Sequence, residues 1–167
     1  MIFKETLTTH KKIKNNLLNL IDKIPMSCTK SSGEHISKTD WNLSEEFKRE
    51  YLNIFYDNIK TLMNRICKRL NTNKWEIHNT WFQQYEINDW HDWHNHERTN
   101  FSAVYYLELP NEELNTKFFN NEEVKVSEGD VLFFPGFLLH RSPINKYSRK
   151  TIIAFNCSFT EWNGTVN

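Results

Sequence analysis

The chain has 167 residues with 21 basic and 21 acidic side chains, a size that fits one domain around one core. Apolar residues make up 38% of the sequence and aromatic residues 14%, which excludes wholesale disorder, because disordered chains combine low hydrophobicity with high net charge. The formal net charge of zero argues against a protein whose main task is to hold nucleic-acid phosphates, and no apolar stretch approaches the roughly 18 residues of a membrane-spanning helix.

The first 73 residues are predicted to be helical and to support the rest of the chain. Thr8 or Thr9 is placed to cap a helix that runs to about Ile24, where Pro25 follows. The apolar residues of this segment form one stripe at helical spacing, at Ile13, Leu17, Leu20, Ile21 and Ile24.

A polar stretch, residues 27–40, is predicted to be a loop. Asn42 and Glu45 then have the spacing of a capping box at a helix start. Apolar residues keep helical spacing from Phe47 to Leu70, which predicts a second, long helix of about 26 residues.

The second half of the chain changes to short segments rich in aromatic and β-branched residues, which is typical of strands. The predicted strands are residues 75–85, 101–109, 117–119, 124–126, 131–135 and 151–159. Several short strands with turns between them indicate a mainly β, α+β fold of the jelly-roll kind, with both helices packed on the outside of one sheet. We predict one domain over residues 1–167, in which residues 1–73 are the helical support and residues 74–160 the jelly-roll core.

Three histidines lie within six residues of the segment WHDWHNHE, and His94 and His96 point to the same face if the backbone is extended. Two imidazoles at one strand end are able to bind one divalent ion, with a third ligand from elsewhere in the chain. His140 is the candidate, because it follows the apolar run VLFFPGFLL and no packing need places a histidine there. The spacing therefore predicts a metal site at His94, His96 and His140.

A cation follows the distal histidine closely. Arg149 is nine residues beyond His140, and its guanidinium matches a carboxylate through two parallel hydrogen bonds. Thr151 points the same way on a strand and is placed to donate to the same anion. Arg141 and Lys150 are competing cations.

These residues together resemble the 2-oxoglutarate and Fe(II) dependent oxygenases, whose pattern is His-x-Asp/Glu, a distant His, and an Arg or Lys about ten residues on. The motifs WHNH, SAVYYLELP, EGDVLFFPGFLLHRSP and RKTIIAFN also resemble a branch found in marine phages and bacteria, over about residues 80 to 160. SKTDW at residues 37–41 is similar to that branch as well, though far less specific. The prolyl 4-hydroxylases are more distant relatives in the same sense.

The resemblance implies a double-stranded β-helix fold, an Fe(II) ion held by His94, His96 and His140, and 2-oxoglutarate anchored by its far carboxylate. The anchor would be Arg149, with further hydrogen-bond donors among Tyr85, Tyr106, Ser142 and Thr151. His96 occupies the position where the family has a carboxylate, so Asp92 and Glu97 remain alternatives for the third ligand.

The implied reaction is hydroxylation of an unidentified substrate, by analogy an amino-acid or peptidyl side chain, with release of succinate and CO2. A cupin-like metal enzyme that does not use 2-oxoglutarate and a non-catalytic jelly-roll binding module are the alternatives. We expect a small-molecule or peptidyl substrate as partner, no stable nucleic-acid binding and no membrane association, and the sequence defines no oligomeric state. The absence of a secretory signal pattern and three cysteines far apart in sequence predict the cytoplasm of a bacterial or phage-infected cell.

Overall fold

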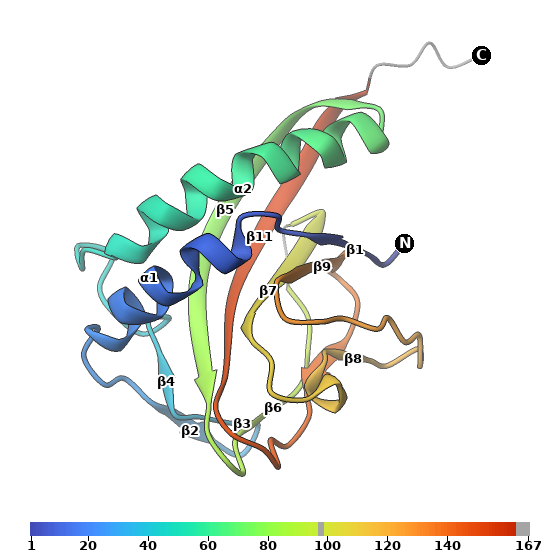
Figure 1. Cartoon of the computed structure of the whole chain (residues 1–167). Coiled ribbons are helices and arrows are strands. Elements are labelled where there is room, and N and C mark those ends of the chain that lie inside the picture. Colours follow the sequence, from blue (N-terminus) through green and yellow to red (C-terminus); the bar gives the residue numbers. More distant parts are fainter. Residues whose placement is uncertain (97–98, 163–167) are drawn as a thin grey trace.

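The computed structural model describes residues 1–96 and 99–162 and contains two helices and two β-sheets (Figure 1). The helices are α1 (His10–Asp22) and α2 (Glu50–Arg69). The strands that precede β5 are β1 (Phe3–Thr6), β2 (Thr29–Ser31), β3 (Glu34–Ile36) and β4 (Lys38–Thr39). The later strands are β5 (Thr72–Tyr85), β6 (Trp90–His94), β7 (Phe101–Glu108), β8 (Lys117–Phe118), β9 (Asp130–Pro135), β10 (His140–Ser142) and β11 (Lys150–Trp162), with one 3-10 turn at Glu112–Leu114.

The strands form a six-stranded sheet in the order β1-β9-β7-β11-β5-β4 and a five-stranded sheet in the order β2-β3-β6-β10-β8. Every pair of neighbouring strands within the two sheets is antiparallel. Both helices lie on one face of the larger sheet, against the long strands β5 and β11 (Figure 1). The predicted architecture, two sheets of a jelly roll with two helices outside one sheet, is confirmed.

Strand alternation divides the interior into two cores on the two faces of the larger sheet. The face toward the helices carries Phe82 from β5, and Ile153 and Phe155 from β11. The opposite face carries Trp81 from β5, and Ile152 from β11. Because neighbouring residues of a strand point to opposite faces, one residue of register decides in which core a side chain lies.

Several strands of the structure depart from the prediction. Residues 27–40, predicted as a loop, contain the short strands β2, β3 and β4, which extend the edges of the two sheets. Their polar composition suits edge strands, which face solvent on one side, and it hides the strand signal. Strand β1 also has no counterpart in the prediction, whereas residues 124–126, predicted as a strand, are not one.

The second helix begins at Glu50 and not near Glu45, so the predicted capping box is wrong. The chain instead turns around the side chain of Arg49, whose guanidinium donates to the backbone carbonyls of Asp40, Leu43, Ser44 and Phe47. These hydrogen bonds satisfy backbone carbonyl groups that, in a helix, would accept hydrogen bonds from backbone N–H groups.

Within the described residues, neither helix has the length and hydropathy of a membrane-crossing segment.

Candidate metal centre

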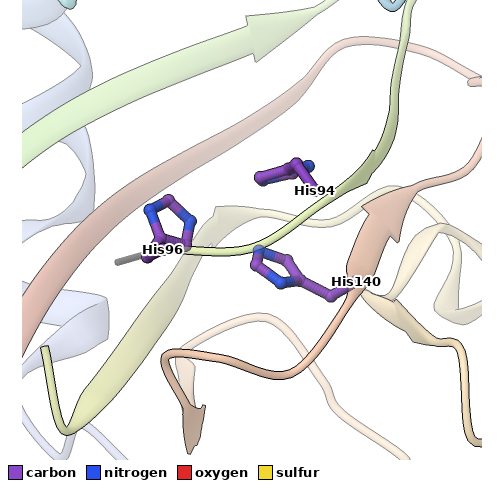
Figure 2. Close-up of side chains that lie close together, drawn as sticks. All are labelled: His94, His96 and His140. Atoms are coloured by element: carbon purple, nitrogen blue, oxygen red, sulfur yellow. The ribbon is translucent and has the colours of Figure 1, made fainter. Parts of the chain in front are cut away.

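Three imidazole rings meet between the two sheets. His94 ends β6, His96 lies two residues further, and His140 opens β10, directly opposite His94 in the antiparallel pairing. The rings of His94 and His140 are 4.2 Å apart between centroids, and His96 lies 5.3 and 5.2 Å from them. One nitrogen from each ring lies within 4.8 Å of the other two, and Figure 2 shows the three side chains turned toward one another.

Two of the three rings have their protonation state set by backbone carbonyls. The Nδ1 atom of His94 lies 2.7 Å from the carbonyl oxygen of Asp92, and the Nδ1 atom of His140 lies 2.9 Å from that of Leu138. A carbonyl oxygen only accepts, so Nδ1 of each ring carries the proton and donates it. Nε2 of each ring then presents its lone pair, as a metal ligand must.

The surroundings keep these imidazoles uncharged. Burial lowers the pKa of His140 to about 2 and that of His96 to about 4, and it also lowers the pKa of His94. A neutral imidazole is the form that binds a metal ion, so the site is prepared for a cation at neutral pH.

His96 is held by the turn that precedes β10. Its backbone N–H donates to the carbonyl oxygen of Gly136 over 2.8 Å. A Cβ on Gly136 would lie 2.5 Å from Cγ2 of Thr99 and 2.7 Å from its carbonyl oxygen, closer than Cβ atoms come to such neighbours, and 3.0 Å from the carbonyl oxygen of His96, which is a tight contact. Only glycine therefore lets this turn approach the backbone of His96, which lies beyond the end of β6 and has no strand partner of its own.

Of the two carboxylates considered as alternative metal ligands, the structure describes only Asp92. Asp92 has an exposed side chain and is not part of the group of converging ligand atoms, although its carbonyl orients His94. Glu97 lies outside the described residues. The ligand set that the described residues bring together is therefore His94, His96 and His140.

A cavity of about 270 Å³ opens beside the three histidines, between the two sheets. At its inner end lies Lys150, the first residue of β11, whose side chain is 2% exposed. Its Nζ atom donates to the carbonyl oxygen of Leu114 and to Oγ of Ser142, each over 2.8 Å. Among the described residues no carboxylate lies within ion-pairing distance of this ammonium group.

The electrostatic state of Lys150 is unusual for a lysine. Burial lowers its pKa to about 7, because charged groups lose their hydration in the interior. An ammonium group has three N–H donors, and two of them have partners here, so one donor is left for a ligand in the cavity. An anion in the cavity would supply both the missing counter-charge and the missing acceptor.

Arg149, predicted as the anchor, is not brought to the cavity. Its guanidinium makes two hydrogen bonds to Glu108, of 2.9 and 3.1 Å, and one of 3.2 Å to Asp22 on α1. Thr151 donates to the same Glu108. Both residues belong to the helix-covered face of the larger sheet, because Lys150 occupies the register position that faces the cavity. The structure thus argues against Arg149 and Thr151 as cavity residues and replaces them with the neighbour that the sequence offers as a competing cation.

The other predicted hydrogen-bond donors are divided. Tyr85 and Ser142 line the cavity beside Lys150, whose Nζ atom lies 5.0 Å from the Tyr85 ring centroid. The Tyr85 hydroxyl donates to Gln83 over 2.8 Å, and burial raises its pKa far above its ordinary value. Tyr106 lies behind the cavity wall, and its hydroxyl accepts a hydrogen bond from the backbone N–H of Thr116 over 2.9 Å.

Three further residues that the sequence analysis did not assign to a site line the cavity. His91 stacks on His94 with centroids 3.8 Å apart, and its Nε2 atom lies 3.3 Å from a carboxylate oxygen of Glu34 on β3. Trp41 lies edge-on to Trp81, with centroids 4.7 Å apart. His91 belongs to the same histidine-rich segment, which was a usable signal, whereas Glu34 comes from the segment predicted as loop and Trp41 directly follows it.

The fold is that of solved oxygenases. The 2-oxoglutarate complex of a viral collagen prolyl hydroxylase from Paramecium bursaria Chlorella virus-1 is 17% identical, with a TM-score of 0.62 over 93% of this chain and 94% of that one. A 2OG-Fe(II) oxygenase family oxidoreductase from Burkholderia pseudomallei is 11% identical, with a TM-score of 0.68 over 94% and 84%. A prolyl hydroxylase from Trichoplax adhaerens, solved with a hypoxia inducible factor peptide, is 14% identical, with a TM-score of 0.62 over 93% and 82%.

These similarities show the fold that this chain shares with the oxygenases, namely the predicted double-stranded β-helix. No protein-family model and no curated protein matches the sequence. The likeness to the branch from marine phages and bacteria rests on the sequence motifs alone.

Proposed function

We propose that this chain is an Fe(II) and 2-oxoglutarate dependent dioxygenase that hydroxylates its substrate with release of succinate and CO2. The observation that carries this proposal is the pairing of two features in one cavity. Three neutral imidazoles converge at its side, and at its inner end lies the buried Lys150 with no carboxylate partner among the described residues. A metal ion and a dianionic keto acid supply the charges that these two features lack.

The donor set fits iron. Imidazole nitrogens suit Fe(II), and three protein ligands on one side of the ion leave positions for other molecules. In this proposal His94, His96 and His140 hold the ion. His94 and His140 bind it through Nε2, because Nδ1 of each of these two rings donates to a backbone carbonyl. The bound iron, with 2-oxoglutarate and O2, supplies the oxidising power for hydroxylation. Three histidines contribute no negative charge, so the site differs by one charge from the His-x-Asp/Glu pattern.

Lys150 anchors 2-oxoglutarate in this proposal. Its free N–H donor and positive charge meet the far carboxylate, while Ser142 and the carbonyl of Leu114 fix the position of Nζ. Tyr85 lies beside the ammonium group and shields it from water. An anion would raise the pKa of Lys150 above 7, so 2-oxoglutarate binds with uptake of a proton at alkaline pH, and its affinity falls as the pH rises above about 7.

The walls of the cavity exclude water from the reacting groups. Phe134 packs on His140 with centroids 4.4 Å apart, and Trp81 lies 5.5 Å from His96. Both residues are buried and line the cavity. Their apolar surface lies against two of the three histidines, which limits the access of water to the metal site.

The substrate expected for this site is a small molecule or a peptidyl side chain. The Trichoplax prolyl hydroxylase with the same fold is solved with a peptide. The cytoplasm of a bacterial or phage-infected cell is the location that we propose, in line with the sequence.

The test is anaerobic titration of the purified protein with Fe(II) and then with 2-oxoglutarate, followed by visible absorption spectroscopy. We expect a charge-transfer band that appears only with both additions, and succinate from labelled 2-oxoglutarate when O2 is admitted. His140→Ala should abolish both signals, whereas His78→Ala, which alters a histidine bonded to Ser158 outside the cluster, should retain them. Iron binding with no response to 2-oxoglutarate would favour the cupin-like alternative. A protein that does not bind iron would favour the non-catalytic binding module.

A further inference from the structure

The lining of the cavity contains a second charged group, a carboxylate. Of the described residues that line the cavity, Glu34 on β3 is the only carboxylate. The two cations that line it are otherwise engaged: Lys150 lies at the inner end, and the guanidinium of Arg141 lies 4.7 Å over the ring of Trp93. Glu34 is therefore the group that gives the remaining cavity wall a negative charge.

The close contact of Glu34 is a histidine and not a lysine or arginine. His91 Nε2 lies 3.3 Å from the carboxylate. No lysine or arginine of the described residues lies within 4.0 Å of Glu34. Burial also raises the pKa of the Glu34 carboxyl group, which shows that its hydration is partly lost. A cation from outside would offset this cost.

An exposed aromatic ring lines the same cavity. Trp41 is 56% exposed although it lies edge-on against the buried Trp81. The preceding residue, Asp40, is completely buried and accepts hydrogen bonds from Arg49, from the Tyr51 hydroxyl and from the Phe82 backbone. This network fixes the backbone next to Trp41, so a large apolar ring is presented to solvent by a rigid segment. Indole faces attract cations.

We propose that the substrate of this site carries a cationic group, an alkylammonium or a guanidinium, and that Glu34 and Trp41 receive it. The inference rests on the proposed function, because it assigns the histidines to the metal and Lys150 to 2-oxoglutarate. What is left for the substrate includes the one carboxylate among the described lining residues and one exposed indole. Together they match a positively charged alkyl chain and disfavour an anionic one.

The test uses two probes of nearly the same shape, butylguanidinium chloride and uncharged butylurea. Each is titrated into Zn(II)-loaded protein with saturating 2-oxoglutarate at constant ionic strength, and binding is followed by protein NMR. A charge-assisted contact predicts that butylguanidinium binds at least about tenfold more tightly than butylurea. Glu34→Gln should abolish this difference, and Trp41→Leu should reduce it. Glu46→Gln, at an exposed carboxylate outside the cavity, is the matched control and should preserve it.

Equal affinities for the two probes, including no detectable binding of either, would overturn the inference, as would a preference that survives Glu34→Gln. The 2-oxoglutarate titration in the same samples separates this inference from the proposed function. If 2-oxoglutarate binds and the two probes do not differ, only the cationic substrate is wrong. If the cation is preferred but 2-oxoglutarate does not bind, the oxygenase proposal fails. The preference of the wild-type protein decides the matter even if a variant does not fold.

Discussion

The two faces of the larger sheet use the same strands for different purposes. Toward the helices, β9 and β11 contribute Phe133 and Phe155, whose ring centroids lie 5.9 Å apart in one hydrophobic cluster. Toward the cavity, β11 contributes Lys150, a buried charge without a carboxylate partner among the described residues. The helix-covered face is packed with apolar side chains, as in a stable core, whereas the cavity face contains a buried charge at the position where we expect a ligand.

Two adjacent cations show the difference most clearly. Arg149 is paired with Glu108 and Asp22, whereas Lys150 has only neutral partners. A paired surface cation contributes little to function and modestly to stability, while an unpaired buried cation costs free energy unless a ligand completes it. Position relative to the sheet, and not the residue type, separates the paired cation Arg149 from Lys150, which we propose as the anchor of 2-oxoglutarate.

The largest effect is expected from breaking the helix-covered core. Phe133→Ala removes a completely buried ring that stacks on Phe3, so the free energy of unfolding should fall by about 3–5 kcal/mol. Phe119→Ala, at a ring that is 64% exposed, is the control and should change it by less than about 0.5 kcal/mol. Urea denaturation measures both. Similar losses in the two variants would mean that the helix-covered face is not the stabilising core.

Acid should destabilise the cavity face first. The pKa of His140 is about 2 in the folded protein and ordinary, near 6.5, in the unfolded chain. Unfolded chains therefore take up a proton as the pH falls below 6.5 while the folded state does not, and stability present above pH 6.5 is lost progressively. At pH 5 we expect a loss of about 1–2 kcal/mol from this imidazole in the metal-free protein.

Urea unfolding of metal-free protein between pH 7.5 and 5 checks this expectation. His91, with a pKa of about 3, should add a loss of its own in the same direction. In His140→Gln the acid-induced loss of unfolding free energy should be smaller by the part that the His140 imidazole contributes. An identical slope in wild type and variant would contradict the buried, neutral state of His140.

A methyl group at Gly136 should weaken the metal site without unfolding the core. Gly136→Ala forces the turn away from the backbone of His96, and we expect metal affinity to fall about tenfold, as for other changes in residues that orient a ligand. Gly33→Ala is the matched control, because a Cβ there meets nothing within 4 Å. Isothermal titration with Zn(II) compares them. Unchanged affinity in Gly136→Ala would show that the turn at Gly136 does not position His96 for the metal.

The smallest effect concerns the hydroxyl of Tyr85, which lines the cavity and is predicted as a further hydrogen-bond donor to 2-oxoglutarate. Tyr85→Phe removes this hydroxyl but keeps the ring beside Lys150, so 2-oxoglutarate binding should weaken by about 0.5–1.5 kcal/mol. Tyr106→Phe, whose hydroxyl bonds Thr116 behind the wall, should leave it unchanged. Calorimetry on the Zn(II)-loaded protein distinguishes the two. A larger effect from Tyr106 would place the keto acid elsewhere.

The sequence revealed the parts of the site that local pattern encodes. His94 and His96 stand two apart in an aromatic segment, and His140 follows a buried strand, so their convergence was predictable from spacing and topology. Strand and helix identities followed from periodicity in the same way. Polar edge strands such as β2 and β3 were missed, because their stability comes from pairing with neighbours and not from their own residues.

The choice between Arg149 and Lys150 was not encoded locally. Both Ile152 and Ile153 are apolar, because each face of β11 is buried in its own core, so alternation of hydrophobicity does not reveal the register. Only the pairing of Lys150 with Tyr85 across β5 fixes which cation faces the cavity. The partners Glu108 and Asp22, distant in sequence, then account for the position of Arg149.

Calorimetric binding of 2-oxoglutarate to Zn(II)-loaded protein tests the central claim most directly when Lys150→Met and Arg149→Met are compared. We predict that Lys150→Met weakens binding by about 1.5–3 kcal/mol, or roughly ten- to a hundredfold, while the metal-free variant remains folded and at least as stable as wild type. Arg149→Met should keep the affinity within about twofold of wild type. The opposite ranking, or wild-type affinity in Lys150→Met, would contradict the account.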